Sequence, residues 1–254
     1  MNRVAFISDI DTPLGYELVR LYLRDEHRVF ATRSDFITSG MEGRNSGEGS
    51  GEGNGAGGEG TERSAPPERP EEPGLEEELE ALREQSGEDL MVERWNRSSP
   101  ISAKSMFLKA LNRFERLDEL LLLGDPPLSI PPLEQVSYEM IERSVDCWIK
   151  GNLFLLKNVI GRYLEAGSGT LALVNTRFHQ APTPLEEAIQ RSFAGLTRSL
   201  LSSYGERGIQ VVAFESTENH SKEFAGYIYK TLTDRGTRAA GRWLRYKRGL
   251  FGGL

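Results

Sequence analysis

The stretch VAFISDIDTPLGYELVRLYLRDEHRVFAT, residues 4–32, decides the fold class of this 254-residue chain. Val4–Ile7 is a short apolar run of the kind that forms a buried strand. Apolar residues then recur at helical spacing over Leu14–Leu23, and Arg28–Thr32 is a second strand-type run. A strand, a helix and a second strand in so short a span predict two parallel strands joined by a crossover helix.

The remainder of the chain continues this alternation. Its pattern predicts further strands over residues 89–94, 117–123, 170–175, 209–214 and 242–246. It predicts helices over residues 75–85, 102–114, 133–165, 184–205 and 222–233, with Gly151 and Gly161 as weak points in the third. The central strands are almost continuously apolar, as in a parallel sheet covered on both faces. We therefore expect residues 1–254 to form a single α/β domain, a doubly wound parallel sheet of the Rossmann type.

One low-complexity segment, residues 38–74, interrupts the pattern. It begins rich in Gly, Ser and Glu and ends rich in Pro, and it has almost no apolar residue to bury. Residues 40–89 hold 15 acidic and 4 basic side chains, a net charge of -11, so the rest of the chain carries +4 of the total of -7. The composition predicts a disordered insertion within the domain, and the acidic balance belongs to that insertion.

Composition excludes several classes of protein. There is no run of about 18 apolar residues, so no transmembrane helix is expected. The N-terminal residues lack the pattern of a secretory signal. The single cysteine, Cys147, rules out an internal disulfide framework and a cysteine-built zinc site, and with three scattered histidines we expect no metal. A cytoplasmic location is the expectation.

Four segments carry a resemblance to a known family. They are Leu117-Asp118-Glu119-Leu120-Leu121, Phe193-Ala194-Gly195-Leu196-Thr197-Arg198-Ser199-Leu200, Gly208-Ile209-Gln210-Val211-Val212 and Ala240-Gly241-Arg242-Trp243-Leu244. In sequence and in order they resemble scaffold segments of the short-chain dehydrogenase/reductase (SDR) family. The resemblance implies a Rossmann fold and an NAD(P)-dependent oxidoreductase ancestry.

The phosphate-binding turn departs from the resembled family. That family has a TGxxxGxG turn, in which glycines let the backbone approach the pyrophosphate at a helix N-terminus. The same turn reads Ser8-Asp9-Ile10-Asp11-Thr12-Pro13-Leu14-Gly15 in this chain. Pro13 removes one amide donor, and two carboxylates lie where phosphates would bind. This pattern disfavours NADP(H), although it leaves the cofactor undetermined. The vestigial positions implied by the resemblance are Ser8, Asp9, Asp11, Thr12, Gly15, Arg33 and Gly124.

Two of these positions lie outside the turn. Arg33, after the second strand, would fit the 2′-phosphate of NADP, or it is a solvated arginine at a strand end. Gly124 is what is left of the family's NNAG turn, which reads Leu122-Leu123-Gly124-Asp125 and lacks both asparagines.

The catalytic pattern of the resembled family is also altered. That family uses a serine and a YxxxK helix, in which tyrosine is the general acid/base and lysine lowers its pKa. Alignment places Glu186 in the tyrosine position, Gln190 in the lysine position and Thr176 near the serine position. The family's helical asparagine corresponds either to Asn152 or to Ile149. The pattern predicts a non-catalytic structural, regulatory or partner subunit; the alternative is an atypical NADP(H)-dependent oxidoreductase that uses Arg33 with Thr176 or Glu186.

A different chemistry at the same strand ends is a further possibility. Asp9, Asp11, Asp125 and His179 could bind a divalent cation or act as acid and base. The competing interpretation is that these are solvated loop residues, which are usually polar.

Two segments suggest partners. The helices over 133–165 and 184–205 carry apolar residues on more than one face, which favours a homodimer or a heterodimer through them; the alternative is ordinary packing on the sheet. Residues 221–254 hold eight basic and two acidic side chains interleaved with aromatics. A basic segment with aromatics can bind nucleic acid or an acidic surface, although nucleic acid is the less favoured of these interpretations. Alternatively, it is an edge strand whose arginines face water, or it meets the acidic insertion within the chain or between subunits.

Overall fold

A computed structural model of the protein describes residues 2–34, 74–124, 130–176 and 182–248. The strands are β1 (Val4–Ile7), β2 (Arg28–Ser34), β3 (Leu90–Trp95), β4 (Glu119–Leu123), β5 (Thr170–Thr176), β6 (Gln210–Ser216) and β7 (Trp243–Tyr246). The α-helices are α1 (Pro13–Arg24), α2 (Leu75–Ser86), α3 (Pro100–Phe114), α4 (Tyr138–Ser144), α5 (Gly151–Ala166), α6 (Pro184–Tyr204) and α7 (Ser221–Ala239). A π-helical segment, η3 (Val145–Lys150), joins α4 to α5.

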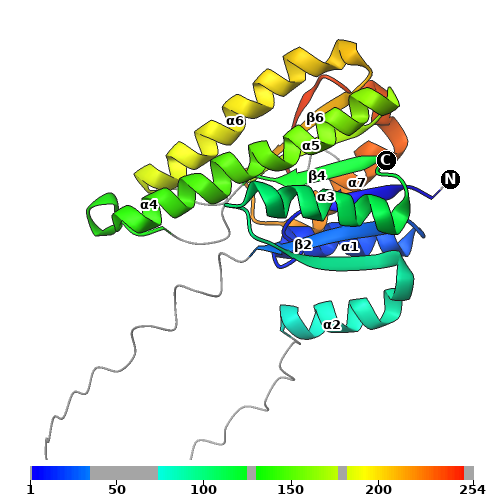
Figure 1. The fold of residues 1–254 in the computed structure, drawn as a ribbon, viewed down its shortest axis with the longest axis horizontal. Helices are drawn as coiled ribbons and strands as arrows, with labels where there is room; N and C mark the ends of the chain where they lie inside the picture. Colours follow the sequence, from blue (N-terminus) through cyan, green and yellow to red (C-terminus); the bar gives the residue numbers. More distant parts are fainter. Residues whose placement is uncertain (1, 35–73, 125–129, 177–181, 249–254) are drawn as a thin grey trace, which may run out of the picture.

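The strands form one parallel sheet in the order β3-β2-β1-β4-β5-β6-β7. The chain builds outward from β1 in one direction through β2 and β3, and then in the other through β4 to β7 (Figure 1). The predicted doubly wound Rossmann-type fold is confirmed. In such a sheet the order reverses beside β1, and ligands bind outside the carboxyl ends of the strands at that point.

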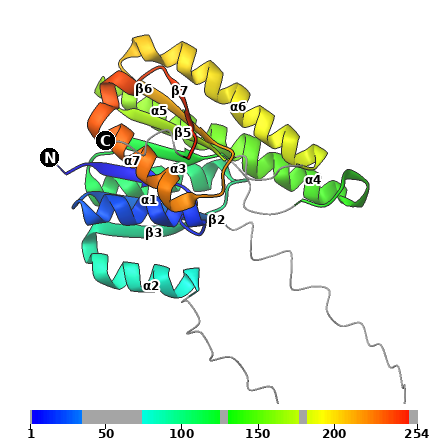
Figure 2. The ribbon, with the colours of Figure 1, turned by 180° about the vertical axis from the view of Figure 1, so that it is seen from behind.

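Helices cover both faces of the sheet. On one face α1 and α7 pack over a core that includes Ile7, Val29 and Phe214; Figure 2 shows these two helices in front of the strands. On the other face α3, α5 and α6 pack over Phe6, Phe30 and their neighbours (Figure 1). The central strands are buried on both sides, which explains their continuous apolar sequence.

Three helices begin with the same local device. Thr12, Ser99 and Thr183 are N-caps whose side chains accept a backbone N–H of the first turn, and each precedes a proline at the first helical position. A side-chain oxygen at the N-cap accepts a backbone N–H that has no acceptor within the helix. Proline is tolerated at the first helical position because the N–H that it lacks would have no partner in the helix. These starts are set by the sequence alone.

The single helix expected over 133–165 is wrong in detail. A short 3₁₀ turn (Leu133–Gln135), α4, η3 and α5 occupy this range.

Neither Gly151 nor Gly161 breaks the helix. A Cβ at Gly151 would lie 2.6 Å from the carbonyl oxygen of Arg97, so a glycine is needed there for close packing. Elsewhere β4 begins two residues later than expected, and α7 continues six residues beyond Thr233.

The outer faces of α5 and α6 are less apolar than the sequence pattern suggested. Leu153 is the one large apolar side chain exposed on these two fully described helices. Within the described residues, no helix has the length and apolar character needed to cross a bilayer. The expected insertion over 38–74 lies outside the described residues except for Gly74, the N-cap residue of α2.

Candidate functional site

In a doubly wound sheet the ligand crevice is formed at the carboxyl ends of the strands where the order reverses, which in this chain is beside β1. Ser8, directly after β1, is fully buried and joins β1 to β4. Its backbone N–H donates to the carbonyl of Leu121 (3.0 Å), and its hydroxyl accepts from the N–H of Leu123 (2.9 Å). Ser8 therefore links β1 to β4, and both its backbone N–H and its hydroxyl oxygen form hydrogen bonds within the sheet.

The turn after β1 is held by its own side chains. Asp9 has a positive φ of 58°, and its carbonyl oxygen accepts from both the N–H (3.0 Å) and the hydroxyl (2.7 Å) of Thr12. A Cβ at Gly15 would lie 2.1 Å from that carbonyl oxygen. Gly15 is thus required for the helix to pack against the turn.

The N-terminus of α1 offers few amides to a ligand. Pro13 has no N–H, and the N–H of Gly15 donates to the Thr12 hydroxyl (3.1 Å). The N–H of Tyr16 already donates to the carbonyl of Thr12 (2.9 Å). Of the first four helical N–H positions only that of Leu14 is left, so this end of the helix is a weak anion site.

A buried arginine that the sequence analysis overlooked occupies the crevice. The Arg97 guanidinium forms an ion pair with Asp9, and its side chain is inaccessible to solvent. A second N–H group donates to the side-chain oxygen of Asn152 (2.7 Å). The guanidinium carbon lies 4.1 Å from the ring centroid of Trp95 and 4.2 Å from that of Trp148. The cation is therefore held between two indoles, a carboxylate and an amide.

Three elements place this cluster. Arg97 follows β3 in the loop before α3, and its carbonyl packs against Gly151. Trp148 belongs to the π-helical η3, and its carbonyl accepts from the side-chain amide of Asn152 (2.6 Å). Asn152, one of the two candidates for the family's helical asparagine, is thus the one in this polar cluster. The sequence contained one signal for this cluster: Trp95, at the end of β3, lies two residues before Arg97.

Asp11 lies at the same turn. Its Oδ2 accepts from the backbone N–H of Ser34 (3.3 Å). Burial, and then the nearby Asp9 carboxylate, raise the pKa of Asp11 to about 6. The Oδ1 atoms of Asp9 and Asp11 are buried and have no hydrogen-bond partner in the described part of the chain. This end of the crevice therefore concentrates negative charge.

Arg33 and Gly124 have structural partners. The Arg33 guanidinium is partly exposed and pairs with Glu76 in the first turn of α2. The N–H of Gly124 donates to the carbonyl of Val174 (2.9 Å). A Cβ at Gly124 would lie 2.0 Å from the ring of Phe193 on α6. An aromatic ring therefore packs directly on this turn.

The predicted catalytic positions differ in their surroundings. Glu186 is buried, and its carboxylate accepts the N–H of Ile130 (2.8 Å) and that of Thr183 (2.7 Å). The second bond completes a capping box at the start of α6. Gln190 is buried one turn further along. Thr176 ends β5 in register with Ser216 of β6. Asp125 and His179 lie outside the described residues.

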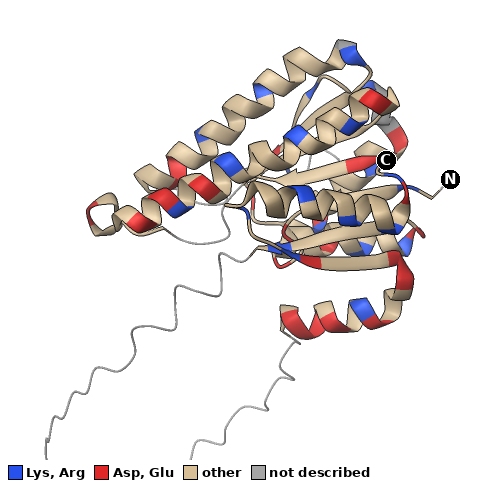
Figure 3. Cartoon of the chain, viewed as in Figure 1, with Lys and Arg blue, Asp and Glu red and all other residues tan. Residues whose placement is uncertain are grey.

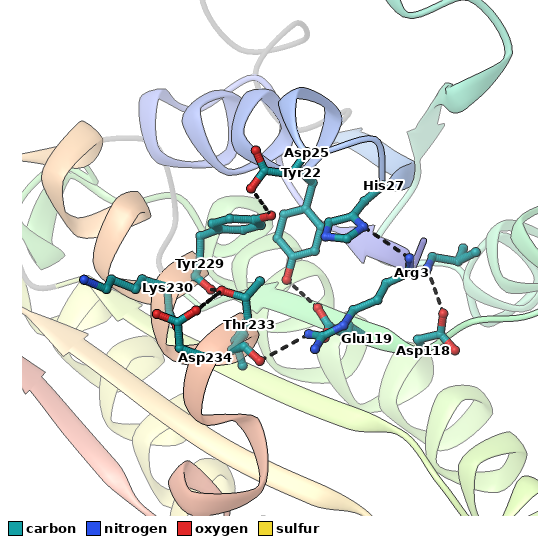
Figure 4. A network of polar contacts seen from close by, with 12 residues as sticks. Arg3, Tyr22, Asp25, His27, Asp118, Glu119, Tyr229, Lys230, Thr233 and Asp234 are labelled. Carbon is teal, nitrogen blue, oxygen red and sulfur yellow. Dashed lines mark hydrogen bonds and ion pairs between the residues drawn. The ribbon is translucent and has the colours of Figure 1, made fainter. Parts of the chain in front are cut away.

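A second polar network lies at the opposite, amino end of the strands (Figure 4). Buried Glu119 accepts from the Tyr22 hydroxyl and pairs with Arg3 (2.5 Å). Burial raises the pKa of Glu119 and holds that of the Tyr22 hydroxyl well above its usual range. A cavity of about 540 Å³ adjoins Arg3 and Glu119. The network ties α1 and α7 to the sheet, since the Arg3 guanidinium also donates to the carbonyl of Leu232 (3.2 Å).

No cluster of three or more His, Cys, Asp or Glu side chains able to hold a metal ion occurs among the residues that the structure describes. Among these residues the charges of Asp9 and Arg97 pair with each other, while Oδ1 of Asp9, Oδ1 of Asp11 and Nε of Arg97 are buried without a hydrogen-bond partner.

The fold is that of the short-chain dehydrogenases and reductases. A short-chain dehydrogenase from Bacillus anthracis matches with a TM-score of 0.69 and 14% identity, over 96% of this chain and 95% of that one. A structure described as ElxO with NADP bound gives 0.69 and 13%, over 96% and 97%. A putative 3-oxoacyl-reductase from Bacillus thuringiensis gives 0.67 and 12%, over 96% of each chain. Comparison of the sequence with family models and with curated proteins gives no match.

Proposed function

We propose that this chain is a non-catalytic protein of the SDR fold that acts as a structural, regulatory or partner subunit. The observation that carries the proposal is the buried Asp9–Arg97 ion pair between Trp95 and Trp148. It places the chain's own charged and aromatic groups beside the first turn, where a doubly wound fold binds its ligand. Solved proteins of the same fold include a putative 3-oxoacyl-reductase and ElxO with NADP bound.

The groups around the turn do not fit a dinucleotide. A pyrophosphate needs several free N–H groups and no competing anion. Pro13 and the Thr12 cap remove most of the amides of α1, and the Asp11 carboxylate, when ionised, would repel the phosphates. The Asp9–Arg97 ion pair is close to neutral as a unit, so it offers no net attraction to offset this repulsion.

The catalytic positions support the same proposal. Both carboxylate oxygens of Glu186 accept backbone N–H groups, so this side chain would have to break the start of α6 to act as an acid or a base. The alternative, an atypical NADP(H)-dependent oxidoreductase, would require Arg33 to leave Glu76. A cytoplasmic location stays a prediction.

Isothermal titration of the purified protein with NADPH and NADH, at low salt and without added metal, tests this proposal. We expect no saturable binding of either cofactor up to about 1 mM. Micromolar binding of NADPH that is lost in Arg33→Ala would overturn the proposal in favour of the oxidoreductase. Turnover of carbonyl substrates with either cofactor would overturn it as well.

We also propose that the protein forms a homodimer, or a heterodimer with a relative, through the region of α5 and α6. Exposed Leu153 supplies an apolar contact on α5. Small exposed side chains on α6, namely Ala188, Ser192, Gly195 and Ser199, would allow another helix to approach closely.

Gly195 offers a clean test, because a Cβ there meets nothing within 4 Å. Gly195→Glu should leave the fold intact and convert a dimer to a monomer in sedimentation velocity. Gly226→Glu on α7, also in open space, is the matched control and should leave the mass unchanged. A protein that is monomeric before substitution, with no relative bound, contradicts this part of the proposal.

A further inference from the structure

Among the residues that the structure describes, β7 forms one edge of the sheet, and no described strand pairs with the outer side of that edge. β7 has β6 on one side and is the last strand in the described order. The N–H of Ala213 donates to the carbonyl of Arg242 (2.9 Å). Because a parallel ladder alternates, Leu244 and Tyr246 direct their backbone groups toward β6, and Trp243 and Arg245 direct theirs to the open edge. An extended segment can therefore add here as an eighth strand.

A groove lies beside this edge, between β7 and α6. It has a volume of about 450 Å³ and is lined by Arg198, Leu201, Ser202, Gly241, Trp243 and Arg245. The Arg198 guanidinium lies 5.5 Å from the ring centroid of Trp243. The indole N–H donates to Glu215 (2.9 Å), which fixes the ring along the groove. The groove thus offers an immobilised aromatic face and a cation next to free backbone groups.

The edge is also positively charged. Arg245 pairs with Glu215 (2.9 Å), but Arg198, Arg242, Lys247 and Arg248 form no ion pair with other described residues. The acidic helix α2 lies by the opposite edge of the sheet, beyond β3 (Figure 3). Four bases of the C-terminal segment, Arg242, Arg245, Lys247 and Arg248, thus lie in β7 or next to it in sequence, and Arg198 of α6 joins Arg245 in the lining of the groove.

We propose that the β7 edge binds an extended acidic peptide segment of a partner protein. The segment's backbone pairs with Trp243 and Arg245, and its carboxylates face the unpaired cations around the groove. A second copy of this chain is the less favourable occupant, because pairing two β7 strands would bring the same cations together. The proposal goes beyond the proposed function and does not depend on whether the crevice is catalytic.

Fluorescence polarisation with a labelled nine-residue peptide of alternating Glu and Val tests this proposal. We expect saturable binding that weakens as salt is added, and none for the Lys/Val peptide of the same length. The decisive probe is the Glu/Val peptide N-methylated at alternate residues, which keeps its charge and loses backbone donors. Its binding should be at least about 10-fold weaker.

Variants on α6 locate the site on the protein. Arg198→Ala removes the cation over Trp243 and should weaken the peptide about 5-fold. Arg191→Ala, two turns earlier on the same helix and outside the groove, is the matched control and should bind as the parent does. Circular dichroism of both variants checks the fold.

Three results would overturn the proposal. One is equal binding of the N-methylated peptide, which would mean charge attraction without strand pairing. Another is equal binding of an oligonucleotide of the same charge, which would point to a general polyanion surface. The third is a dimer that dissociates in Arg198→Ala, which would assign the edge to a second copy.

Discussion

At the residue scale, Arg97 is the central side chain of the buried polar cluster beside the turn after β1. Its positive charge is fully buried, yet it is balanced by Asp9, hydrogen-bonded to Asn152 and stacked between Trp95 and Trp148. Burying a charge is costly unless it is paired and hydrogen-bonded. Here the two charges are paired, although Nε of Arg97 and Oδ1 of Asp9 have no hydrogen-bond partner among the described residues. We therefore expect removal of one member of the pair to destabilise the fold more than removal of both.

Arg97→Met should reduce the free energy of unfolding by about 3–5 kcal/mol, because it leaves the Asp9 carboxylate buried without a partner. The double variant Asp9→Asn with Arg97→Met should recover a large part of this loss, since no unpaired charge is left. Urea unfolding of the two single variants and the double variant measures the coupling. Additive losses would show that the two charges do not depend on each other.

The pKa of Asp11 makes stability depend on pH. The pKa of Asp11 is about 6 in the folded protein, raised by burial and by Asp9 from its usual value of 3.8. Well below pH 3.8 the carboxyl is protonated in both states and does not affect stability. Between the two pKa values the unfolded chain loses this proton while the folded chain keeps it, so stability falls as the pH rises toward 6 and the loss is complete above that pH.

Asp11→Asn should therefore stabilise the protein at pH 7.5, by on the order of 2 kcal/mol, and have little effect at pH 4. An asparagine oxygen can still accept the N–H of Ser34. Chemical unfolding at both pH values measures the difference. Asp89→Asn, at an exposed position, serves as the control and should change neither value. Equal effects of Asp11→Asn at both pH values would contradict the assigned pKa.

At the element scale, the start of α6 shows how one buried side chain fixes both a helix and a neighbouring loop. Thr183 caps the helix, Pro184 opens it and Glu186 returns a hydrogen bond to the N–H of Thr183. The same carboxylate holds the N–H of Ile130, which approaches from a different part of the chain. The helix start and the neighbouring loop are thus fixed by a single buried side chain.

Glu186→Ala should cost about 2–3 kcal/mol in the free energy of unfolding, since it removes the capping box and leaves the buried N–H of Ile130 without an acceptor. Glu187→Ala, the next residue, removes a salt bridge to Arg191 and should cost about 0.5 kcal/mol or less. Thermal and urea unfolding compare the two. Equal losses would mean that Glu186 has no structural role beyond its charge.

At the scale of the whole molecule, the described domain is complete as a packed sheet with helices on both faces. Its two apolar cores are built from β1–β7 and the helices around them, all within the described residues. The acidic low-complexity segment contains almost no apolar residue that could add to these cores.

Deleting residues 40–73 should therefore leave the melting temperature within about 2 °C of the parent value. Differential scanning calorimetry on the two proteins makes this comparison. If the deletion instead unfolds the domain, the prediction of a disordered insertion is wrong.

The cooperativity of the transition in the parent also tests the single-domain prediction for residues 1–254, because two domains would give two transitions.

Much of the scaffold could be predicted from the sequence because its signals are local. Val4–Ile7, the helix after Thr12 and the capped start of α6 depend on neighbours within a few residues. Prediction from sequence fails where the local helix or strand preference does not end at the same residue as the element itself. The range 133–165 kept an apolar helical pattern although its backbone changes to a π-helix over Val145–Lys150.

The sequence by itself determined the parallel α/β fold and which residues stand at the turn after β1 and on the helix that begins at Pro184. Only the tertiary structure decided which side chains from distant segments meet them. Asp9 and Arg97 are 88 residues apart, and Glu186 meets the N–H of Ile130 across 56 residues. Phe193 reaches Gly124 from another helix. Periodicity and capping act over one or two turns, whereas ion pairs and packing between distant segments exist only once the sheet has brought them together.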